Sequence, residues 1–456
     1  DIDGGAGTDF IDESANTTGL VVTLSDVAGA GSIVDGAETD TVDNIENIDT
    51  GSGADTFNMG DSDLNIINAG IGTDTVNILN ANDIIVTRIG TDVFVTDNAT
   101  GVGDDEYYDV EQVNISGTAG DDVFQIDDVL DNIIDGQGGT NEIDYSLVTA
   151  VINVNVLSGG TTVTSTGIGT DTISNIQNIT TGDGADIFVI EENSEDNILD
   201  AGVGNDTATY TAAGTISATN SGSSILVETS TDTDQLDNFE TVDFNGSTGD
   251  DTFIINDAND NTIDGSSEGS NGDTYDASFA TNSITVSTGA SVTAVGADVG
   301  TDTLVDNITT GSGDDTFIID TTIGGTFNFN AGESATLGNI FQFTGDGTGI
   351  TNITITSSST ATDVLDFSQF TGGGLDIDLN TTTIAAGNML VTFDSFIDDV
   401  IGTDNDDTIT GNSLSNNISG GAGNDTINYS AGDDVIDGGA GDDTVDYIGA
   451  PSAIST

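Results

Sequence analysis

The chain has 456 residues, of which 80 are acidic and only one, Arg88, is basic, so its formal net charge is −79. We expect such a polyanion to repel nucleic acids and anionic membrane surfaces and to need an abundant cationic partner. There is no cysteine for a disulfide or a zinc–thiolate site, no apolar stretch approaches the roughly 18–20 residues of a membrane span, and hydrophobic residues at 35% suffice only for a thin core.

The chain begins with a nonapeptide unit rich in glycine and aspartate, GGAGTDFID (4–12). It starts inside a repeat and without a methionine, so we expect a mature fragment or an excerpt of a longer protein. Similar units recur in groups of three, and the leading turns of these groups follow one another with a period of about 65 residues, which indicates a repeat architecture. Many units carry an aspartate at their sixth position; up to residue 320 these are Asp9, Asp55, Asp74, Asp122, Asp186, Asp206, Asp251 and Asp315.

Three of the repeated turns depart from this pattern. Asn141 replaces the sixth-position aspartate in GQGGTNEID, and Asn416 does so in a turn that lacks glycine at its fourth position. The turn after Gly265 is longer, so either Asn271 or Asp273 could take the sixth position. These departures put the corresponding cation sites in doubt.

Alternating apolar and polar residues fill the stretches between the groups of turns, each of about 38 residues. VINVNVL (151–157) and LDIDLN (375–380) are examples, and strict alternation predicts half-buried strands rather than helices. The stretches end in a second recurring sequence, TDTVDNIENI (39–48) or TDTISNIQNI (170–179). We therefore expect the repeat architecture to run on through them, with 321–400 as its least regular β segment.

The plainest repeat lies near the C-terminus, where five nonapeptides follow one another without a gap over 402–446. The first six positions of each unit, rich in glycine, favour a turn with exposed carbonyl groups, and the last three favour a short strand with one apolar side chain pointing inward. Two nonapeptides close one coil. This spacing predicts one column of sixth-position residues formed by Asp407, Asp425 and Asp443, and an opposite column formed by Asn416 and Asp434.

Two of these units, GGAGNDTIN (420–428) and GGAGDDTVD (438–446), match the pattern GGxGxDxUx at every defined position. The sequence thus resembles the repeats-in-toxin (RTX) family, whose nonapeptide is a calcium-binding β-helix repeat. The resemblance implies a parallel β-roll, folding that depends on Ca²⁺, and export in the unfolded state. It also implies that the turn glycines Gly420, Gly421, Gly423, Gly438, Gly439 and Gly441 belong to the calcium sites.

Aromatic residues follow the sixth position at two fixed distances. At the second position after it comes a phenylalanine column, which we expect in the core: Phe57, Phe124, Phe188, Phe253 and Phe317. At the fourth position after it come tyrosines, which share that face of the strand, so core or turn packing is favoured over a sugar-stacking ladder: Tyr145, Tyr210, Tyr429 and Tyr447, together with Tyr275 if Asn271 holds the sixth position of its turn. The chain contains no histidine to act as a catalytic base, and close acid pairs are inevitable among 80 acids, so no enzyme is expected.

The expected fold class is all-β: a parallel β-solenoid of the RTX type, with superrepeats over 1–320, an irregular β segment over 321–400, an uninterrupted β-roll over 401–447 and a tail over 448–456. The expected function is that of a secreted structural protein, a rod or lattice element of a surface layer, filament or adhesin stalk. The alternatives are a module that binds polysaccharide or another surface, and the repeat region of a secreted enzyme. The expected partners are many Ca²⁺ ions per chain and further copies of the chain, joined end to end, or the rest of a longer polypeptide.

Overall fold

The computed structural model consists of β-strands and turns. It describes the whole chain except residues 26–28, 61–63, 80–83, 90–91, 98–104, 194, 222–223, 247, 250, 257–261, 265–266, 269–272, 281–283, 288–291, 297–299, 305–306, 323–325, 333–337, 350–351, 358–361, 387 and 449–456. None of the described residues lies in a helix long and apolar enough to cross a membrane. The strands form two compact units, the first within Asp1–Thr241 and the second mainly from Val242 onward.

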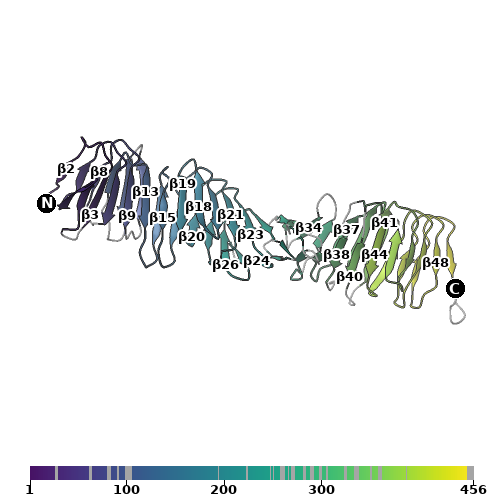
Figure 1. Cartoon of the computed structure of the whole chain (residues 1–456). Helices are drawn as coiled ribbons and strands as arrows, with labels where there is room; N and C mark the ends of the chain where they lie inside the picture. The colour runs from purple at the N-terminus through teal and green to yellow at the C-terminus, as the bar shows by residue number, and fades with distance from the viewer. Residues whose placement is uncertain are drawn as a thin grey trace. The chain divides into compact units, whose positions relative to one another are not determined.

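Strands in the first unit are short because a turn soon ends each of them, and successive strands alternate between two sheets (Figure 1). Single strands pair in parallel with the strand one coil away, as β7 pairs with β9 and β14 with β16. The single strands are β2 (Phe10–Asp12), β6 (Asn47–Asp49), β7 (Thr56–Gly60), β8 (Ile66–Asn68), β9 (Thr75–Leu79), β13 (Gln112–Ser116), β14 (Val123–Asp127), β15 (Ile133–Asp135), β16 (Glu142–Asp144), β20 (Asn178–Thr180), β21 (Ile187–Glu191), β22 (Ile198–Asp200) and β23 (Thr207–Thr211).

The alternating stretches form three-stranded antiparallel meanders rather than further coils. In each meander the first and last strands also pair in parallel with neighbouring coils, as β17 does with β21 and β19 with β15. The meanders of the first unit are β3 (Leu20–Ser25), β4 (Ser32–Asp35) and β5 (Glu38–Asp43); β10 (Ile84–Ile89), β11 (Asp92–Asp97) and β12 (Asp105–Tyr108); and β17 (Asn153–Leu157), β18 (Gly160–Ser165) and β19 (Gly169–Ser174). The expectation of a wholly parallel solenoid is therefore wrong at these stretches, because each one folds back twice within a single sheet.

A meander followed by four single strands makes one superrepeat. Five consecutive sheet positions are an odd number, so the next meander falls on the other sheet: β3–β5 and β17–β19 belong to one sheet and β10–β12 to the other. This arrangement accounts for the long period that separates the groups of turns in the sequence.

The second unit repeats the same plan. Its meander consists of β33 (Ile284–Ser287), β34 (Val292–Gly296) and β35 (Gly300–Leu304). The segment expected to be irregular contributes parallel strands to both sides of the solenoid, with register shifts where β41 pairs with β39 and β45, and one antiparallel hairpin, β43–β44. After β37 (Thr316–Asp320), which precedes this segment, its strands are β38 (Thr326–Asn330), β39 (Ile340–Gly345), β40 (Asn352–Thr356), β41 (Asp363–Phe370), β42 (Asp376–Asp378), β43 (Thr383–Ala386), β44 (Met389–Phe393) and β45 (Ile397–Ile401).

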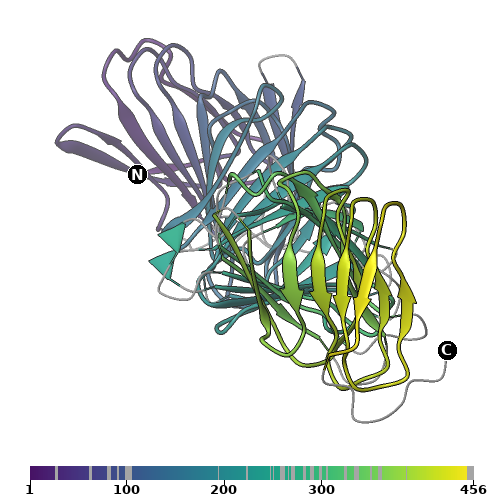
Figure 2. The same cartoon turned by 90° about the vertical axis from the view of Figure 1, so that its right-hand side faces the viewer.

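The nonapeptide run closes one coil with every two units, as expected. One side carries β46 (Thr408–Thr410), β48 (Thr426–Asn428) and β50 (Thr444–Asp446), and the other β47 (Asn417–Ser419) and β49 (Val435–Asp437). Ile409 pairs with Ile427, and Ile427 with Val445, each one coil further along the chain. Figure 2 shows these C-terminal strands side by side, in yellow and yellow-green.

The core is a thin layer of side chains between the two sheets. Within each strand buried and half-exposed residues alternate, as in β7, where Phe57 and Met59 are fully buried. All five phenylalanines of the predicted core column are fully buried, and so are Tyr145, Tyr210 and Tyr275. Core packing is thereby confirmed for these aromatic residues, whereas Tyr447 is 44% exposed.

Candidate cation-binding turns

Most sixth-position side chains connect two coils. In the nonapeptide run the backbone N–H of Asp407 donates to Oδ1 of Asp425 at 2.8 Å, and that of Asp425 donates to Oδ1 of Asp443 at 3.0 Å. On the opposite side the N–H of Asn416 donates to Oδ1 of Asp434 at 3.1 Å. The two columns that the nonapeptide spacing predicts are therefore present, held together by side-chain-to-backbone hydrogen bonds.

The same series of hydrogen bonds between sixth-position residues, called the ladder below, runs through the superrepeats. The N–H of Asp55 donates to Asp74 at 2.7 Å, and the N–H of Asp186 donates to Asp206 at 2.6 Å. Asp251 donates to Asp273 in the same way, which identifies Asp273 as the sixth-position residue of the longer turn; Asn271 lies outside the described residues. Five carboxylates of the ladder accept the N–H of a residue that opens or precedes a strand: Asp55 from Leu20, Asp186 from Ile152, Asp251 from Gly214, Asp315 from Ile284 and Asp407 from Leu375.

The ladder also contains side chains that the sequence did not single out. At the end of a group of turns, the N–H of the last sixth-position residue donates to a longer side chain from the second recurring sequence. Asp9, Asp74 and Asp206 donate to Glu46, Glu111 and Glu240, each at 2.7 Å, and Asn141 donates to Gln177 at 2.9 Å. The acid or amide within NIENI and NIQNI was the available signal, because it recurs 34 to 37 residues after a sixth-position residue.

Tight approach between coils explains the turn glycines. In the GGAGND turn Gly421 has φ of 104° and Gly423 has φ of 120°, backbone conformations that residues other than glycine rarely adopt. A β-carbon on Gly421 would lie 2.1 Å from the carbonyl oxygen of Thr403, one coil away. Gly439 and Gly441 repeat this arrangement in the last turn of the run, whereas a β-carbon on Gly438 would meet the side chain of Asp443 in the same turn. Both backbone conformation and space therefore require glycine here.

The second carboxylate oxygen of several ladder residues is buried without a hydrogen-bond partner among the described residues. Oδ2 of Asp74, Asp206 and Asp425 is in this state although the three residues are at most 1% exposed. An ionised carboxylate offers only acceptors, so an unpaired buried oxygen is costly unless a proton or a cation reaches it. Asp9, Asp55, Asp186 and Asp315 also bury an Oδ2 atom of this kind.

Other turns supply a donor of their own. Thr118 donates its N–H to Oδ2 of Asp122 at 2.7 Å, and Thr403 donates its N–H to Oδ2 of Asp407 at 2.6 Å. The hydroxyl of Ser430 donates to Oδ2 of Asp434 at 2.8 Å. Asp443, by contrast, is exposed.

Burial raises the pKa of several of these carboxyl groups. Loss of hydration, reinforced by the neighbouring charges of Asp55, Glu111 and Asp109, raises the pKa of Asp74 to about 6. Burial is also the largest cause of the raised pKa of Asp186, Asp206, Asp315, Asp407 and Asp425. Each of these groups therefore disfavours a bare negative charge, and a bound cation would relieve that penalty.

Backbone oxygens complete the surroundings of the turns. A β-carbon on Gly420 would lie 2.4 Å from Oδ2 of Asp425 and 2.4 Å from the carbonyl oxygen of Gly438, so these two oxygens flank the same small space. No three acidic side chains among the described residues gather closely enough to hold a metal ion by themselves. A cation in these turns would thus be held by one or two carboxylates together with carbonyl oxygens, a donor set that suits Ca²⁺.

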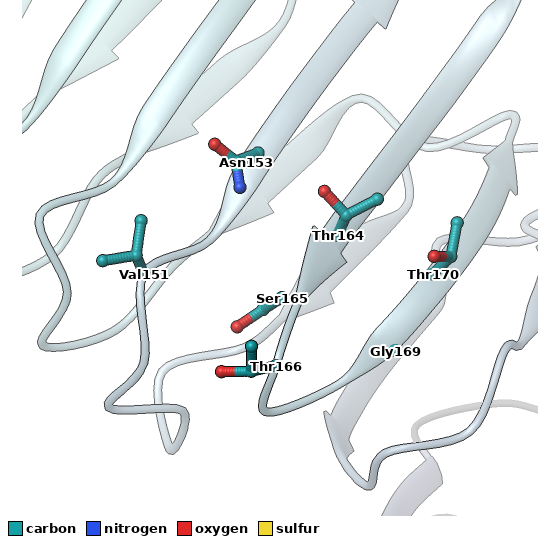
Figure 3. A pocket seen from close by; sticks show the side chains of 7 residues that line it. All are labelled: Val151, Asn153, Thr164, Ser165, Thr166, Gly169 and Thr170. Carbon is teal, nitrogen blue, oxygen red and sulfur yellow. The ribbon is translucent and has the colours of Figure 1, made fainter.

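The surface also carries a shallow groove of about 670 Å³ beside the meander β17–β19. Figure 3 shows its lining, in which Thr164, Ser165, Thr166 and Thr170 contribute hydroxyl groups and Asn153 an amide. None of the residues that line it is acidic or aromatic. The groove therefore has neither the carboxylates of the turns nor an aromatic platform for a sugar.

No family model matches the chain, and no curated protein is similar to it.

Proposed function

We propose that the protein is a calcium-stabilised structural repeat protein of the extracellular space, with RTX-type turns that bind Ca²⁺. The observation that carries the proposal is the buried, unpartnered Oδ2 of Asp74, Asp206 and Asp425, which for Asp206 and Asp425 lies next to a turn carbonyl group. The chain has one basic side chain for 80 acids, so its own residues cannot neutralise them. Calcium suits the oxygen-only surroundings, and it is available at about millimolar concentration to extracellular modules.

A structural role follows from how the coils depend on one another. Each coil contributes one thin core layer, and each ladder hydrogen bond links two coils, so the fold gains stability by stacking. Burial differs between neighbouring coils of the nonapeptide run, where Val445 is 38% exposed while Ile427, one coil earlier, is fully buried. A further coil, from the same polypeptide or from a second copy, would cover Val445. We propose that the protein serves as such a stackable element in a surface layer, filament or adhesin stalk.

A calcium titration of the full chain tests the proposal. In excess chelator at pH 7.5 we expect loss of most of the β-sheet circular dichroism signal, and its recovery when Ca²⁺ is added. A ligand at 100 times its dissociation constant stabilises a folded protein by about 2.7 kcal/mol per site, so several sites together exceed the stability of an ordinary domain. Equilibrium dialysis should count several bound Ca²⁺ ions per chain, and Mg²⁺ at the same concentration should not substitute. An undiminished signal in chelator would refute the calcium role.

A further inference from the structure

In the turn that ends in Asn141, the buried carbonyl oxygens accept hydrogen bonds from a side-chain amide, so they do not need a cation. Asn141 is fully buried, and its Oδ1 accepts the N–H of Asp122 at 2.9 Å, as an aspartate would. The two N–H groups of its Nδ2 face three carbonyl oxygens, so one N–H is shared between two of them: Asn175 at 2.8 Å, Gly136 at 3.0 Å and Gly138 at 3.2 Å. One amide group thus fills the position in which turn carbonyls converge.

The Asp425 turn has the same arrangement of atoms with one exchange. A β-carbon on Gly136 would lie 2.5 Å from Nδ2 of Asn141 and 2.3 Å from the oxygen of Asn175. The matching distances at Gly420 are 2.4 Å to Oδ2 of Asp425 and 2.4 Å to the oxygen of Gly438. The donor Nδ2 is therefore replaced by an acceptor, Oδ2, which faces another acceptor.

The remaining turns show why Asp425 is the informative position. At Asp122 and Asp407 a threonine in the second position donates its N–H to Oδ2. The Asp74, Asp206 and Asp425 turns have glycine in that position, and their Oδ2 atoms have no partner among the described residues. The carboxylates of these three turns therefore need a cation, as do those of Asp9, Asp55, Asp186 and Asp315, whose turns share both features.

We infer that the sixth-position residue decides, turn by turn, whether calcium is required: the Asn141 turn is closed by its own amide and takes no calcium, whereas the Asp74, Asp206 and Asp425 turns each need it. This inference rests on the proposed function, which supplies the identity of the cation. It divides the chain into segments that hold together without calcium and segments that do not. The coils around Asn141 are a segment of the first kind, and the nonapeptide run around Asp425 is one of the second.

Two reciprocal substitutions in the full chain test the inference, with Ca²⁺ alone as the probe. Asn141→Asp should add one bound Ca²⁺ per chain in equilibrium dialysis, and Asp425→Asn should remove one. Asp442→Asn is the matched control, since it removes the same charge from an exposed residue of a neighbouring turn and should leave the count unchanged.

Hydrogen exchange gives the regional readout. In chelator, the amides of β16 should exchange at least tenfold faster in Asn141→Asp than in wild type, and those of β48 at least tenfold slower in Asp425→Asn. If the wild-type chain binds calcium but neither substitution changes the count, the inference is wrong and the proposed function stands. If the wild-type chain binds no calcium, both fall. Should Asn141→Asp fail to fold even with Ca²⁺, the Asp425→Asn chain alone decides the outcome.

Discussion

The superrepeat region and the C-terminal nonapeptide run use one ladder with two different cores. In the superrepeats, successive rungs within a group of turns lie 19 to 22 residues apart. Strands such as β7 and β21 have five residues, which gives room for two buried side chains per strand. In the nonapeptide run rungs lie 18 residues apart, strands have three residues, and each buries one isoleucine at most. The run therefore has less apolar burial with which to oppose the repulsion between its carboxylates.

Removing a core aromatic residue should reduce the stability that the superrepeats gain from their greater apolar burial. Phe188 is fully buried and makes an edge-on contact with Phe239, with ring centroids 4.9 Å apart. Phe188→Ala should lower the free energy of unfolding by about 3–5 kcal/mol in saturating calcium, through lost burial and the cavity left behind. Ile427→Val in the nonapeptide run should cost only about 0.5–1.5 kcal/mol. Urea denaturation of both variants measures the difference, and equal losses would contradict the comparison.

The superrepeat region also contains hydrogen bonds from buried tyrosine hydroxyls to buried carboxylates, which are not found among the described residues of the nonapeptide run. The hydroxyl of Tyr145 donates to Oδ2 of Asp171 at 2.8 Å, and that of Tyr210 donates to Asp234 at 2.8 Å; all four side chains are at most 1% exposed. Tyr145→Phe would leave Oδ2 of Asp171 without this donor, so we expect a loss of about 1.5–3 kcal/mol at pH 7.5, measured by urea denaturation.

Tyr429→Phe is the control for that substitution. Tyr429 lies half-buried in the nonapeptide run and contacts the ring of Tyr447. Its hydroxyl should matter little, so urea denaturation should give nearly the wild-type midpoint. A loss in Tyr429→Phe as large as that in Tyr145→Phe would show that the carboxylate contact is not the cause.

The last expected effect is the pH dependence of the calcium-free chain. Burial raises the pKa of Asp171 to about 7 and that of Asp234 to about 6, both above the ordinary value near 3.8. Between pH 4 and 7 the folded chain then holds protons that the unfolded chain has released, so stability should rise as the pH falls from 7.5 to 5, by at most about 1.4 kcal/mol per pH unit for each group. The β-sheet circular dichroism signal that remains in chelator, compared at the two pH values, measures the change.

Asp171→Asn should flatten this dependence, because the amide does not titrate. A calcium-free chain that becomes less stable at pH 5 than at pH 7.5 would contradict the assignment of raised pKa values to the buried carboxyls.

The columns of ladder residues could be predicted from the sequence, but the direction of the intervening strands could not. The strict nonapeptide spacing fixes which residues stack, so Asp407, Asp425 and Asp443 were placed in one column from spacing alone. Alternation of apolar and polar residues is the same in parallel and antiparallel strands, so it left the meanders undetected. Turn signals were present, since Gly36 and Gly160 take positive φ between meander strands, but such glycines are common throughout this chain.

The candidate site was predictable only in part for a related reason. The nonapeptide pattern identifies Asp425 and its glycines, and it marks Asn141 as a departure without saying what the amide does. The direction of Nδ2 toward three carbonyl groups depends on the approach of the next coil, which is a property of the stacked structure. The same holds for Glu46 and Gln177, whose role appears only when the second recurring sequence is placed over the turn.

Because a superrepeat contains an odd number of sheet positions, successive meanders of the first unit lie on alternate sheets. The meanders that begin at Leu20 and Asn153 share a sheet, and the one between them lies on the other. A binding partner that recognises one meander would therefore meet the same surface only at every second superrepeat. Deleting a single superrepeat would exchange the sheets of all later meanders, whereas deleting two would leave them where they are, so gain or loss in pairs is the change that such a surface tolerates.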